Sequence, residues 1–411
     1  MTKITDIPAI RFKGFSDTWE QRKLSEIATM HARIGWQNLR TSEFLDSGDY
    51  MLITGTDFID GAVNFDTCHY VERERYEQDK HIQIRNGSIL ITKDGTLGKV
   101  AYIQGLTMPA TLNAGVFNVE IKDENEVDNR YLFQYLKAPF LMDYVDKKAT
   151  GGTIKHLNQN ILVDFPVVLP HKAEQEKIGE YFLAIDHLIT LHQRKYDKLQ
   201  VLKKAMLEKM FPKNGSSVPE IRFKGFTDAW EQRKLGEVSE SYSGGTPSVG
   251  VKEYYGGQIP FIRSAEINSE ITELFLTEEG LKKSSARLVA MGDILYALYG
   301  ATSGEVGRAR LRGAINQAIL AINPHTGYDS EYLAQWLRKS KHSIIETYLQ
   351  GGQGNLSGTI VKELLVDFPS LKEQRAIGDF FSQLDHLITL HQRELEKLKN
   401  LNKACLEKMF V

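Results

Sequence analysis

Two stretches of the chain, residues 178–211 and 377–410, carry its most regular pattern of apolar and polar positions. In each stretch the apolar positions recur at alternating steps of four and three, an average near 3.5 that is typical of a coiled-coil helix. No glycine or proline interrupts residues 182–210 or 380–409. Extended back to residue 173, the first predicted helix would be about 58 Å long.

Two such helices in one chain are expected to pack on each other, antiparallel because the chain has to return. His192 and His391 fall on the same seam, where we interpret them as packed side chains rather than metal ligands. The residues predicted to pack the helix pair are Ile178, Phe182, Ile185, Ile189, Tyr196, Leu199, Leu202, Met206, Ile377, Phe381, Leu384, Ile388, Leu395, Leu398, Leu401 and Cys405.

Outside these stretches the pattern indicates mixed α/β structure. Short β-rich runs separated by Gly, Asp and Asn turns occur at residues 51–54, 88–92, 100–103, 116–121, 259–263, 294–298 and 318–322. Each half then closes with a predicted helix, 129–146 in the first and 330–348 in the second, followed by a strand with the sequence VDFP.

The chain is also a tandem repeat, which decides the predicted architecture. Residues 8–28 and 219–239 are identical at 15 of 21 positions, and residues 178–211 and 377–410 at 22 of 34. Residues 163–166 (VDFP) recur as 366–369. Between these blocks the halves diverge, although Gly-Asp-Ile-Leu at 292–295 still resembles Gly-Ser-Ile-Leu at 87–90 and the turn at 299–304 resembles that at 94–98.

The predicted fold class is therefore α+β: two globular α/β domains separated by two long helices that form an antiparallel coiled coil, with a pseudo-two-fold internal repeat. We expect a first globular domain at 1–170, a first helix at 171–213, a second domain at 214–369 and a second helix at 370–411. Two like frames with unlike surfaces are what a protein needs to read two different half-sites. The bland alternative is two copies of one fold.

Composition narrows the class of protein. With 42% hydrophobic and 25% charged residues the chain should fold as a soluble protein, and it has neither a membrane-length apolar run nor a signal-peptide pattern, so a cytoplasmic location is expected. Cys68 and Cys405 are too few for a disulfide framework or a zinc cluster and are expected to be buried. The formal charge of −2 gives no direct support to DNA binding, so a DNA reader with this charge would need either to segregate its own charged residues or to obtain basic surface from a partner.

Sequence motifs of catalysis are missing. The chain has no Pro-Pro dipeptide, as an amino-methyltransferase tetrad would require, and no His-Glu pair, as a zinc-protease helix would require. The single Gly-Lys pair is followed by Val100, which excludes a phosphate-binding P-loop. The doublets Asp186-His187 and Asp385-His386 are interpreted as polar surface or interface residues, since helix neighbours point about 100° apart.

The order of globular half, long helix, globular half and long helix resembles the specificity subunits of Type I restriction–modification systems, in particular the Gram-positive bacterial members. The opening IRFKGF…WEQRKL and the doubled helix entrance, Pro170…Glu174-Gln175…Ile178 and Pro369…Glu373-Gln374…Ile377, are similar to the repeated elements of that family. Four additional residues separate Pro166 from Ile178 compared with Pro369 from Ile377, which questions the equivalence of the two entrances.

The resemblance implies two target recognition domains that each read half of a split sequence in double-stranded DNA. It implies helices that set the half-site spacing and dock two methyltransferase (modification) subunits, with restriction (translocase) subunits joining them. This chain would be a non-catalytic subunit of a Type I site-specific deoxyribonuclease and adenine methyltransferase complex. S-adenosylmethionine, ATP and magnesium would belong to the partners, with no cofactor or metal on this chain.

Candidate DNA-contacting residues are polar or aromatic side chains in loop-like surroundings, because base reading needs such groups on rigid loops. Any one of them could equally be a solvated turn position, while Trp19 and Trp230 are expected in the core. The candidates are Arg33, Trp36, Asn38, Arg40, Lys93, Thr96, Lys99, Lys155 and His156 in the first half, and Tyr242, Ser243, Thr246, Arg263, Tyr299, Thr302, Ser303, Arg308, Arg310, Gln353 and Asn355 in the second.

One alternative function remains open at this point: a two-domain coiled-coil adaptor without sequence-specific DNA binding. It predicts globular halves that resemble each other, because both would meet similar partners, whereas the halves of this chain diverge. A stand-alone nuclease is disfavoured by the missing motifs.

Overall fold

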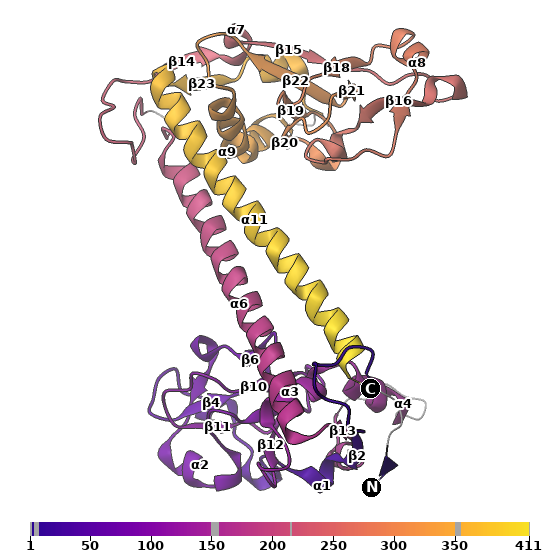
Figure 1. Cartoon of the computed structure of the whole chain (residues 1–411). Helices are drawn as coiled ribbons and strands as arrows, with labels where there is room; N and C mark the ends of the chain where they lie inside the picture. Colours follow the sequence, from indigo (N-terminus) through magenta and orange to yellow (C-terminus); the bar gives the residue numbers. More distant parts are fainter. Residues whose placement is uncertain (1, 4–7, 149–155, 214–215, 350–354, 411) are drawn as a thin grey trace. The chain divides into compact units, whose positions relative to one another are not determined.

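The computed structural model describes residues 2–3, 8–148, 156–213, 216–349 and 355–410, with the exception of the side chain of Trp36. Its contacts divide the chain into two compact units, which we call unit 1 (residues 1–192 and 394–411) and unit 2 (residues 193–393). The division crosses both long helices, so each unit holds one globular part and a portion of each helix (Figure 1).

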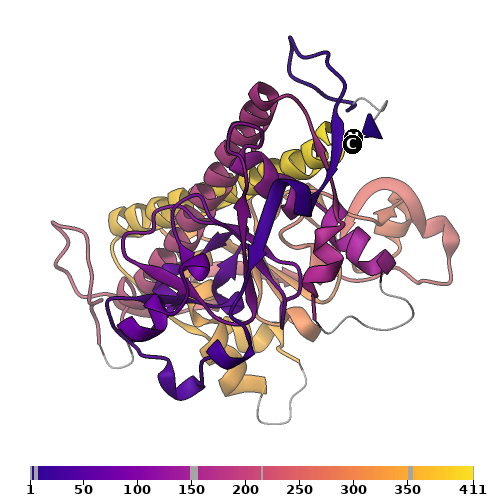
Figure 2. The same cartoon turned by 90° about the horizontal axis from the view of Figure 1, so that it is seen from below.

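Unit 1 is built on two four-stranded sheets, shown from below in Figure 2. The first is antiparallel, with the order β10-β9-β12-β3, and the second has the order β7-β4-β11-β8, in which β4 and β11 are parallel. The strands of these sheets are β3 (Ala28–His31), β4 (Met51–Ile53), β7 (His69–Tyr70), β8 (Gln83–Ile84), β9 (Ile89–Thr92), β10 (Val100–Tyr102), β11 (Ala110–Leu112) and β12 (Val116–Ile121).

Smaller elements complete unit 1. Strands β1 (Thr2–Lys3), β2 (Glu20–Lys23) and β13 (Pro166–Leu169) form a third sheet, and β5 (Phe58–Ile59) and β6 (Ala62–Val63) form a hairpin. The α-helices are α1 (Leu24–Ile27), α2 (Arg73–Glu77), α3 (Asn129–Lys137), α4 (Phe140–Lys148) and α5 (Gln159–Val163), and the short 3-10 helix η5 spans Lys80–Ile82.

Unit 2 repeats this topology with other residues. Its sheets have the orders β15-β22-β19-β20, β17-β16-β21-β18 and β14-β23. The strands are β14 (Glu231–Lys234), β15 (Ser239–Ser243), β16 (Tyr255–Ile262), β17 (Phe275–Leu276), β18 (Arg287–Val289), β19 (Ile294–Ala297), β20 (Val306–Arg308), β21 (Gly313–Ile315), β22 (Ile319–Pro324) and β23 (Leu365–Phe368). The helices are α7 (Leu235–Val238), α8 (Glu278–Lys282), α9 (Ser330–Leu349) and α10 (Gly358–Lys362), with the 3-10 helix η8 at Gly300–Thr302. All seven predicted β-rich runs contain strand residues, which confirms the mixed α/β reading.

The first sheet of each unit is buried on both faces. Along β9, Ile89 and Ile91 point into a core shared with α3 and α6, whereas Leu90 points into a second core under the other sheet. The same alternation occurs along β19, where Ile294 and Tyr296 face one core and Leu295 faces the other. This period-2 pattern explains why these strands read as continuous apolar runs in the sequence.

The two long helices are α6 (Lys172–Lys209) and α11 (Leu371–Met409). Within unit 1 the first turns of α6 lie beside the last turns of α11, and within unit 2 the last turns of α6 lie beside the first turns of α11, so the pair is antiparallel in each unit (Figure 1). Among the described residues, no helix combines the length and the apolar character needed to cross a membrane.

The residues at the end of each long helix pack in the same hydrophobic core as the first turns of the other long helix. Phe410 lies in unit 1, 5.6 Å (ring centroids) from Phe182 and 5.6 Å from Tyr131. Its repeat counterpart Phe211 lies in unit 2, 5.4 Å from Tyr332 and 6.1 Å from Phe381. Both phenylalanines are almost fully buried, so each globular part includes the end of the helix that started in the other.

The predicted helix seam is correct at most positions and wrong at two. Ten of its residues are buried, namely Ile178, Phe182, Ile185, Ile189, Ile377, Phe381, Leu384, Ile388, Leu395 and Cys405. Tyr196, Leu199, Met206 and Leu398 are partly buried, as are His192 and His391. Leu202 and Leu401 are exposed, and the next residues, Lys203 and Asn402, turn inward instead. A helix of 3.6 residues per turn drifts by about 20° per heptad against a 3.5 repeat, which moves the seam by one residue toward the helix ends.

Two further expectations need correction. The predicted helix 129–146 is broken into α3 and α4, because Pro139 cannot continue a helix and pushes Ala138 into an extended conformation (ψ 160°). The VDFP repeat is also not a structural correspondence. Residues 163–165 precede β13, which begins at Pro166, whereas Val366-Asp367-Phe368 lie inside β23.

Strand pairing gives the true alignment of the helix entrances. Pro166 pairs with Lys23 and Leu365 pairs with Lys234, the repeat counterpart of Lys23, so Pro166 corresponds to Leu365 rather than to Pro369. Pro170 then corresponds to Pro369, and both lie eight residues before the isoleucine of the helix. The two entrances are equivalent: β13 corresponds to β23 residue for residue, and the apparent four extra residues arise because the VDFP sequence lies four residues earlier in the first half than in the second.

Candidate nucleic-acid interface

In unit 1 the candidate interface is built around the turn between β9 and β10. Thr92 closes this turn, since its N–H donates to the Lys99 carbonyl (2.9 Å) and its hydroxyl accepts from the Lys99 N–H (2.9 Å). Gly95 and Gly98 adopt φ values of 73° and 71°, which only glycine adopts without strain. The turn therefore holds Lys93, Thr96 and Lys99 on a short, hydrogen-bonded loop.

Three other segments are tied to the same end of the sheet. The Lys93 N–H donates to the Gly115 carbonyl (2.8 Å), and the Lys93 carbonyl accepts from the Leu157 N–H (2.8 Å). A hollow at this place is lined by the start of the loop after β3, the β9–β10 turn and the segment before α5, with Arg33, Lys93, Asp94, His156, Asn158 and Gln159 among its residues. The structure thus brings together candidates that are more than 100 residues apart in the sequence.

The turn between β19 and β20 in unit 2 is held in the same way. The Leu298 N–H donates to the Ala318 carbonyl (2.8 Å) and the Leu298 carbonyl accepts from the Leu356 N–H (3.1 Å), as Lys93 does with Gly115 and Leu157. Gly300 and Gly304 have φ values of 74° and 77°. Leu298 thus occupies the place of Lys93, and Tyr299, Thr302 and Ser303 occupy the turn, which confirms the weak match between these two turns in the sequence.

The first-half candidates divide into buried and exposed groups. Arg33 is 2% exposed and donates to the Leu112 carbonyl (2.6 Å), and burial together with the nearby Arg75 charge lowers the pKa of its guanidinium to about 10. Lys93 is partly buried, with Nζ 5.4 Å from the centre of the Phe117 ring. Asn38, Arg40, Thr96, Lys99 and His156 are exposed, with His156 paired to Asp94.

Several of the second-half candidates form ion pairs or hydrogen bonds with other residues of unit 2. Arg263 is paired with Glu266 (2.7 Å) and Glu273 (2.8 Å). Arg308 lies 3.5 Å from Glu331, and burial lowers the pKa of its guanidinium. Tyr242, Ser243, Tyr299 and Thr302 are partly exposed, Ser303 is buried, and Thr246, Arg310 and Asn355 are exposed, with the Thr246 hydroxyl 2.6 Å from Gln317 and Arg310 3.7 Å from Glu270.

Some candidates fall outside the described residues, and other residues at this place were not predicted. Lys155, Gln353 and the side chain of Trp36 are not described. Asn158 and Gln159 line the hollow of unit 1 and Gln317 contacts Thr246 in unit 2, but none of the three was among the sequence candidates. Of these, Gln317 follows Asn316, the repeat counterpart of Asn113, so a closer alignment of the two halves could have found it.

The doubled Glu-Gln motif at the helix entrances joins each helix to its own globular part. Glu174 accepts two hydrogen bonds of 2.7 Å from Arg11, and Glu373 accepts two of 2.7 Å from Arg222. Both glutamates are almost completely buried, so these bidentate pairs are shielded from water. The repeated IRFKGF and Glu-Gln segments therefore form one structural contact, twice.

The adjacent glutamines bind the residues that immediately precede α3 and α9. The Gln175 side chain accepts from the Asp128 N–H (2.9 Å) just before α3 and donates to the Pro170 carbonyl (2.9 Å). Gln374 makes the same two bonds, to the Asp329 N–H (2.9 Å) and the Pro369 carbonyl (2.8 Å). These contacts fix the start of each long helix to the start of α3 or α9.

The repeated Asp-His doublets are structural, as expected. Asp186 accepts from Gln134 and Lys137 of α3 (2.8 Å each) and from Asn402 of α11 (3.2 Å). Asp385 is bound by the corresponding residues of unit 2, Gln335 at 3.0 Å, Arg338 at 3.7 Å and Lys203. His187 and His386 are exposed. Each aspartate thus joins a globular helix to both long helices.

The remaining sequence expectations concern buried residues. Trp19 and Trp230 are buried in the core. Cys68 and Cys405 are also buried and free, and burial together with the Asp57 carboxylate raises the pKa of the Cys68 thiol to about 12. Both pairs behave as predicted.

Comparison with known proteins identifies the family. The model of the Type I restriction modification DNA specificity domain matches residues 16–201 and again residues 227–400. The chain therefore belongs to this family, which confirms the resemblance inferred from its repeated motifs.

Individual relatives agree with this assignment. The chain is 30% identical over 190 residues to the specificity subunit of the Type I restriction enzyme MjaIX of Methanocaldococcus jannaschii, a match that covers 44% of each protein. It is 24% identical over 344 residues to the MjaVIII specificity subunit of the same organism, covering 79% of this chain and 78% of that subunit. A crystal structure of the Type I restriction–modification S subunit from M. genitalium shares the fold, with a TM-score of 0.71 at 16% identity over 99% of both chains.

Proposed function

We propose that this chain is the sequence-reading subunit of a Type I restriction–modification complex, in which each unit reads one half of a bipartite site in double-stranded DNA. The observation that carries the proposal is the loop cluster that occurs once in each unit, meaning the loops joined by backbone hydrogen bonds at Lys93 in unit 1 and at Leu298 in unit 2. The hydrogen bonds at Lys93 and Leu298 are the same, yet the side chains that they present are unrelated. A constant frame with variable side chains is suited to reading two different base sequences.

Within the proposed interface, the exposed polar residues of each cluster are the DNA-contacting groups. In unit 1 these are Asn38, Arg40, Thr96, Lys99 and His156, with Lys93 at the edge of the hollow. In unit 2 they are Thr246 and Asn355, which are exposed, and Tyr299 and Thr302, which are partly exposed. Arg310 follows the other end of β20, beside the start of β19, and lies outside this cluster. Arg33, Arg263, Ser303 and Arg308 act instead as supports, because their polar groups are buried or bound to other residues of the chain.

The long helices are proposed to set the spacing of the half-sites and to dock two modification subunits. Leu188 and Leu191 in unit 1 are exposed on α6, and Leu387 and Leu390 are exposed at the same positions of α11 in unit 2. All four belong to the repeated DHLITLHQR run, which is identical in both helices. Equivalent apolar pairs, one per unit, fit two copies of the same partner, which would cover them.

Catalysis is assigned to the partners. Methylation with S-adenosylmethionine would reside on the modification subunits, and ATP- and magnesium-dependent translocation and cleavage on restriction subunits. The chain itself would contribute recognition and assembly, and its formal charge of −2 fits a reader that obtains part of its phosphate-neutralising surface from these partners.

The proposal is tested by exchanging residues 29–152 for the corresponding stretch of another specificity subunit. The reconstituted complex with modification subunits is incubated with genomic DNA, and the methylated motif is mapped. We expect one half of the motif to change, with the other half and the spacing retained. A change in both halves would refute independent reading, and methylation without a bipartite motif would favour the adaptor function.

A further inference from the structure

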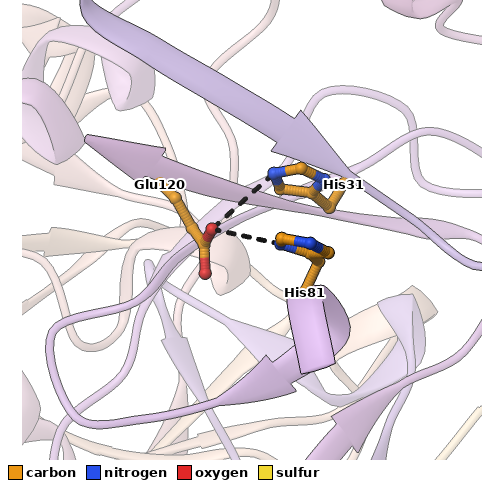
Figure 3. A group of neighbouring side chains, drawn as sticks. All are labelled: His31, His81 and Glu120. Carbon is orange, nitrogen blue, oxygen red and sulfur yellow. Dashed lines mark ion pairs between the residues drawn. The ribbon is translucent and has the colours of Figure 1, made fainter. Parts of the chain in front are cut away.

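A second cluster of functional side chains lies in unit 1, away from the β9–β10 turn. His31 ends β3, Glu120 lies near the end of β12, and His81 belongs to η5, which leads into β8 of the other sheet. Glu120 Oε2 lies 3.6 Å from Nε2 of His31 and 4.0 Å from Nδ1 of His81 (Figure 3). The two imidazole rings are stacked, with centroids 4.5 Å apart and planes 19° from parallel.

We propose that His31, His81 and Glu120 form a binding site for a divalent transition-metal ion, zinc foremost. One ligand atom from each residue lies within 4.8 Å of the others, so small side-chain rotations would bring all three onto one ion. Two imidazoles and one carboxylate form a known zinc ligand set, with a fourth position left to water. Imidazole nitrogen favours zinc, copper or nickel over magnesium or calcium.

The neighbouring residues already hold the ligands in place. Asn118 lies opposite His31 in the sheet, and its Nδ2 donates to Oε1 of Glu120 (3.3 Å) and to the His81 carbonyl (3.0 Å). Asn118 therefore orients the carboxylate and ties η5 to the sheet, as outer residues of metal sites do. Its Oδ1 is buried and lacks a hydrogen-bond partner among the described residues.

Access and charge also suit an exchangeable ion. The side chains of His31, His81 and Glu120 are 29%, 66% and 38% exposed, which leaves an open path from solvent. With neutral imidazoles the cluster carries one negative charge, which favours a dication. Thr29 Oγ1 lies 3.0 Å from Nε2 of His31 and would give up this contact when the ion binds.

In unit 2 the corresponding strands, β15 and β18, are connected by a direct contact between side chains. Tyr242 on β15 takes the place of His31, and the Arg287 guanidinium of β18 lies 3.9 Å from the centre of the Tyr242 ring. The position of Glu120 is held by Asn323. Both units thus connect the end of the first sheet to the edge strand of the second, through a cation–π contact in unit 2 and through the His-His-Glu cluster in unit 1.

The site is tested on the full chain carrying no histidine tag and treated with EDTA. Cobalt(II) is titrated and followed by visible absorption, and zinc is then added as a competitor. We expect one cobalt ion per chain at this site, displacement by zinc, and a rise of the first thermal transition by about 3 °C in the presence of zinc. His81→Ala and Glu120→Gln should weaken binding by about tenfold or more while leaving the far-UV spectrum unchanged.

His342→Ala is the matched control, because His342 and Glu346 form an exposed imidazole–carboxylate pair (3.1 Å) in unit 2 that the described residues do not extend to a third ligand. This variant should bind cobalt like the wild type. Absence of saturable binding, or equal affinity in the wild type, H81A and E120Q, would overturn the proposal. A cluster that responds to pH but to neither metal would overturn it as well.

Discussion

The two units differ where they face solvent at the loop clusters and agree where the long helices enter and end. At the helix entrances, Arg11 with Glu174 and Arg222 with Glu373 make the same bidentate contact at the same distances. At the turns, Lys99 of unit 1 is replaced by Glu305 of unit 2, a reversal of charge on an otherwise equivalent hydrogen-bonded position. The contrast teaches that the contacts that attach the long helices to the globular parts are the same in both units, whereas the side chains on the turns differ.

The largest expected effect is the loss of stability when the phenylalanine that follows each long helix is removed from the core of its unit. Phe410→Ala should destabilise unit 1 by about 3–5 kcal/mol, because the ring fills the core beside Phe182, whereas Phe211→Ala should destabilise unit 2 by a similar amount. Hydrogen exchange resolved along the chain would locate the loss. If the Phe410 variant lost protection in unit 2 instead, the placement of Phe410 in the core of unit 1 would be wrong.

A smaller effect is expected at the aspartates that join three helices. Asp186→Ala leaves Lys137 and Gln134 without their common acceptor and should cost about 1–3 kcal/mol, with the loss in unit 1. Asp385→Ala is the matched variant and should act on unit 2. Chemical denaturation followed by tryptophan fluorescence would measure both losses. Unchanged midpoints in both variants would show that these contacts contribute nothing net.

The N-cap of α3 should make the stability of unit 1 depend on pH. Burial opposes ionisation of Asp128, but hydrogen bonds from Arg130 and the Tyr131 N–H outweigh it and hold the pKa below its ordinary value of 3.8. A depressed pKa adds stability above the unfolded value and loses it as the pH falls through the folded value.

Asp128→Asn should therefore cost about 1 kcal/mol at neutral pH, and this cost should shrink below about pH 4. Asp329→Asn removes the carboxylate that accepts from the Tyr332 N–H at the start of α9 and serves as the matched variant in unit 2. Urea unfolding of both variants at several pH values would measure the cost of each substitution. A cost for Asp128→Asn that is independent of pH would rule out the ionised cap.

The smallest effect concerns one phosphate contact. Lys99→Ala should weaken DNA binding by the reconstituted complex and lower the slope of log affinity against log salt by about 1. Lys13→Ala removes an exposed lysine from another part of unit 1 and serves as the control. Fluorescence anisotropy over a range of salt concentrations gives both slopes. Equal slopes for the wild type and Lys99→Ala would remove this lysine from the interface.

The sequence predicted the frame well, because the frame is repeated. Apolar periodicity and the matching blocks located both long helices, and the doubled Glu-Gln motif marked their entrances. The error in aligning the helix entrances arose because a short sequence match, VDFP, disagrees with the alignment given by strand pairing. VDFP occurs twice by coincidence of residue type, and only the pairing of Pro166 with Lys23 and of Leu365 with Lys234 reveals the four-residue shift.

The candidate interface could be predicted only in part. Glycines at 95, 98, 300 and 304 marked the turns, because their positive φ angles are encoded by residue type. Arg33 looked like a loop arginine, and its burial depends on carbonyl groups of β11 and α2 that are distant in the sequence. The His31–His81–Glu120 cluster was invisible for the same reason, since three segments that are far apart in the sequence form it.

The most direct test of independent reading uses one variant in each turn. Complexes are reconstituted with the Thr96→Ala, Lys99→Ala double variant of unit 1 or with the Tyr299→Ala, Thr302→Ala double variant of unit 2, and preferred sequences are selected from random duplex DNA. The account predicts that each variant relaxes its own half-site and leaves the other half-site and the spacing intact. Relaxation of both half-sites by either variant, or of neither half-site by both, would contradict it.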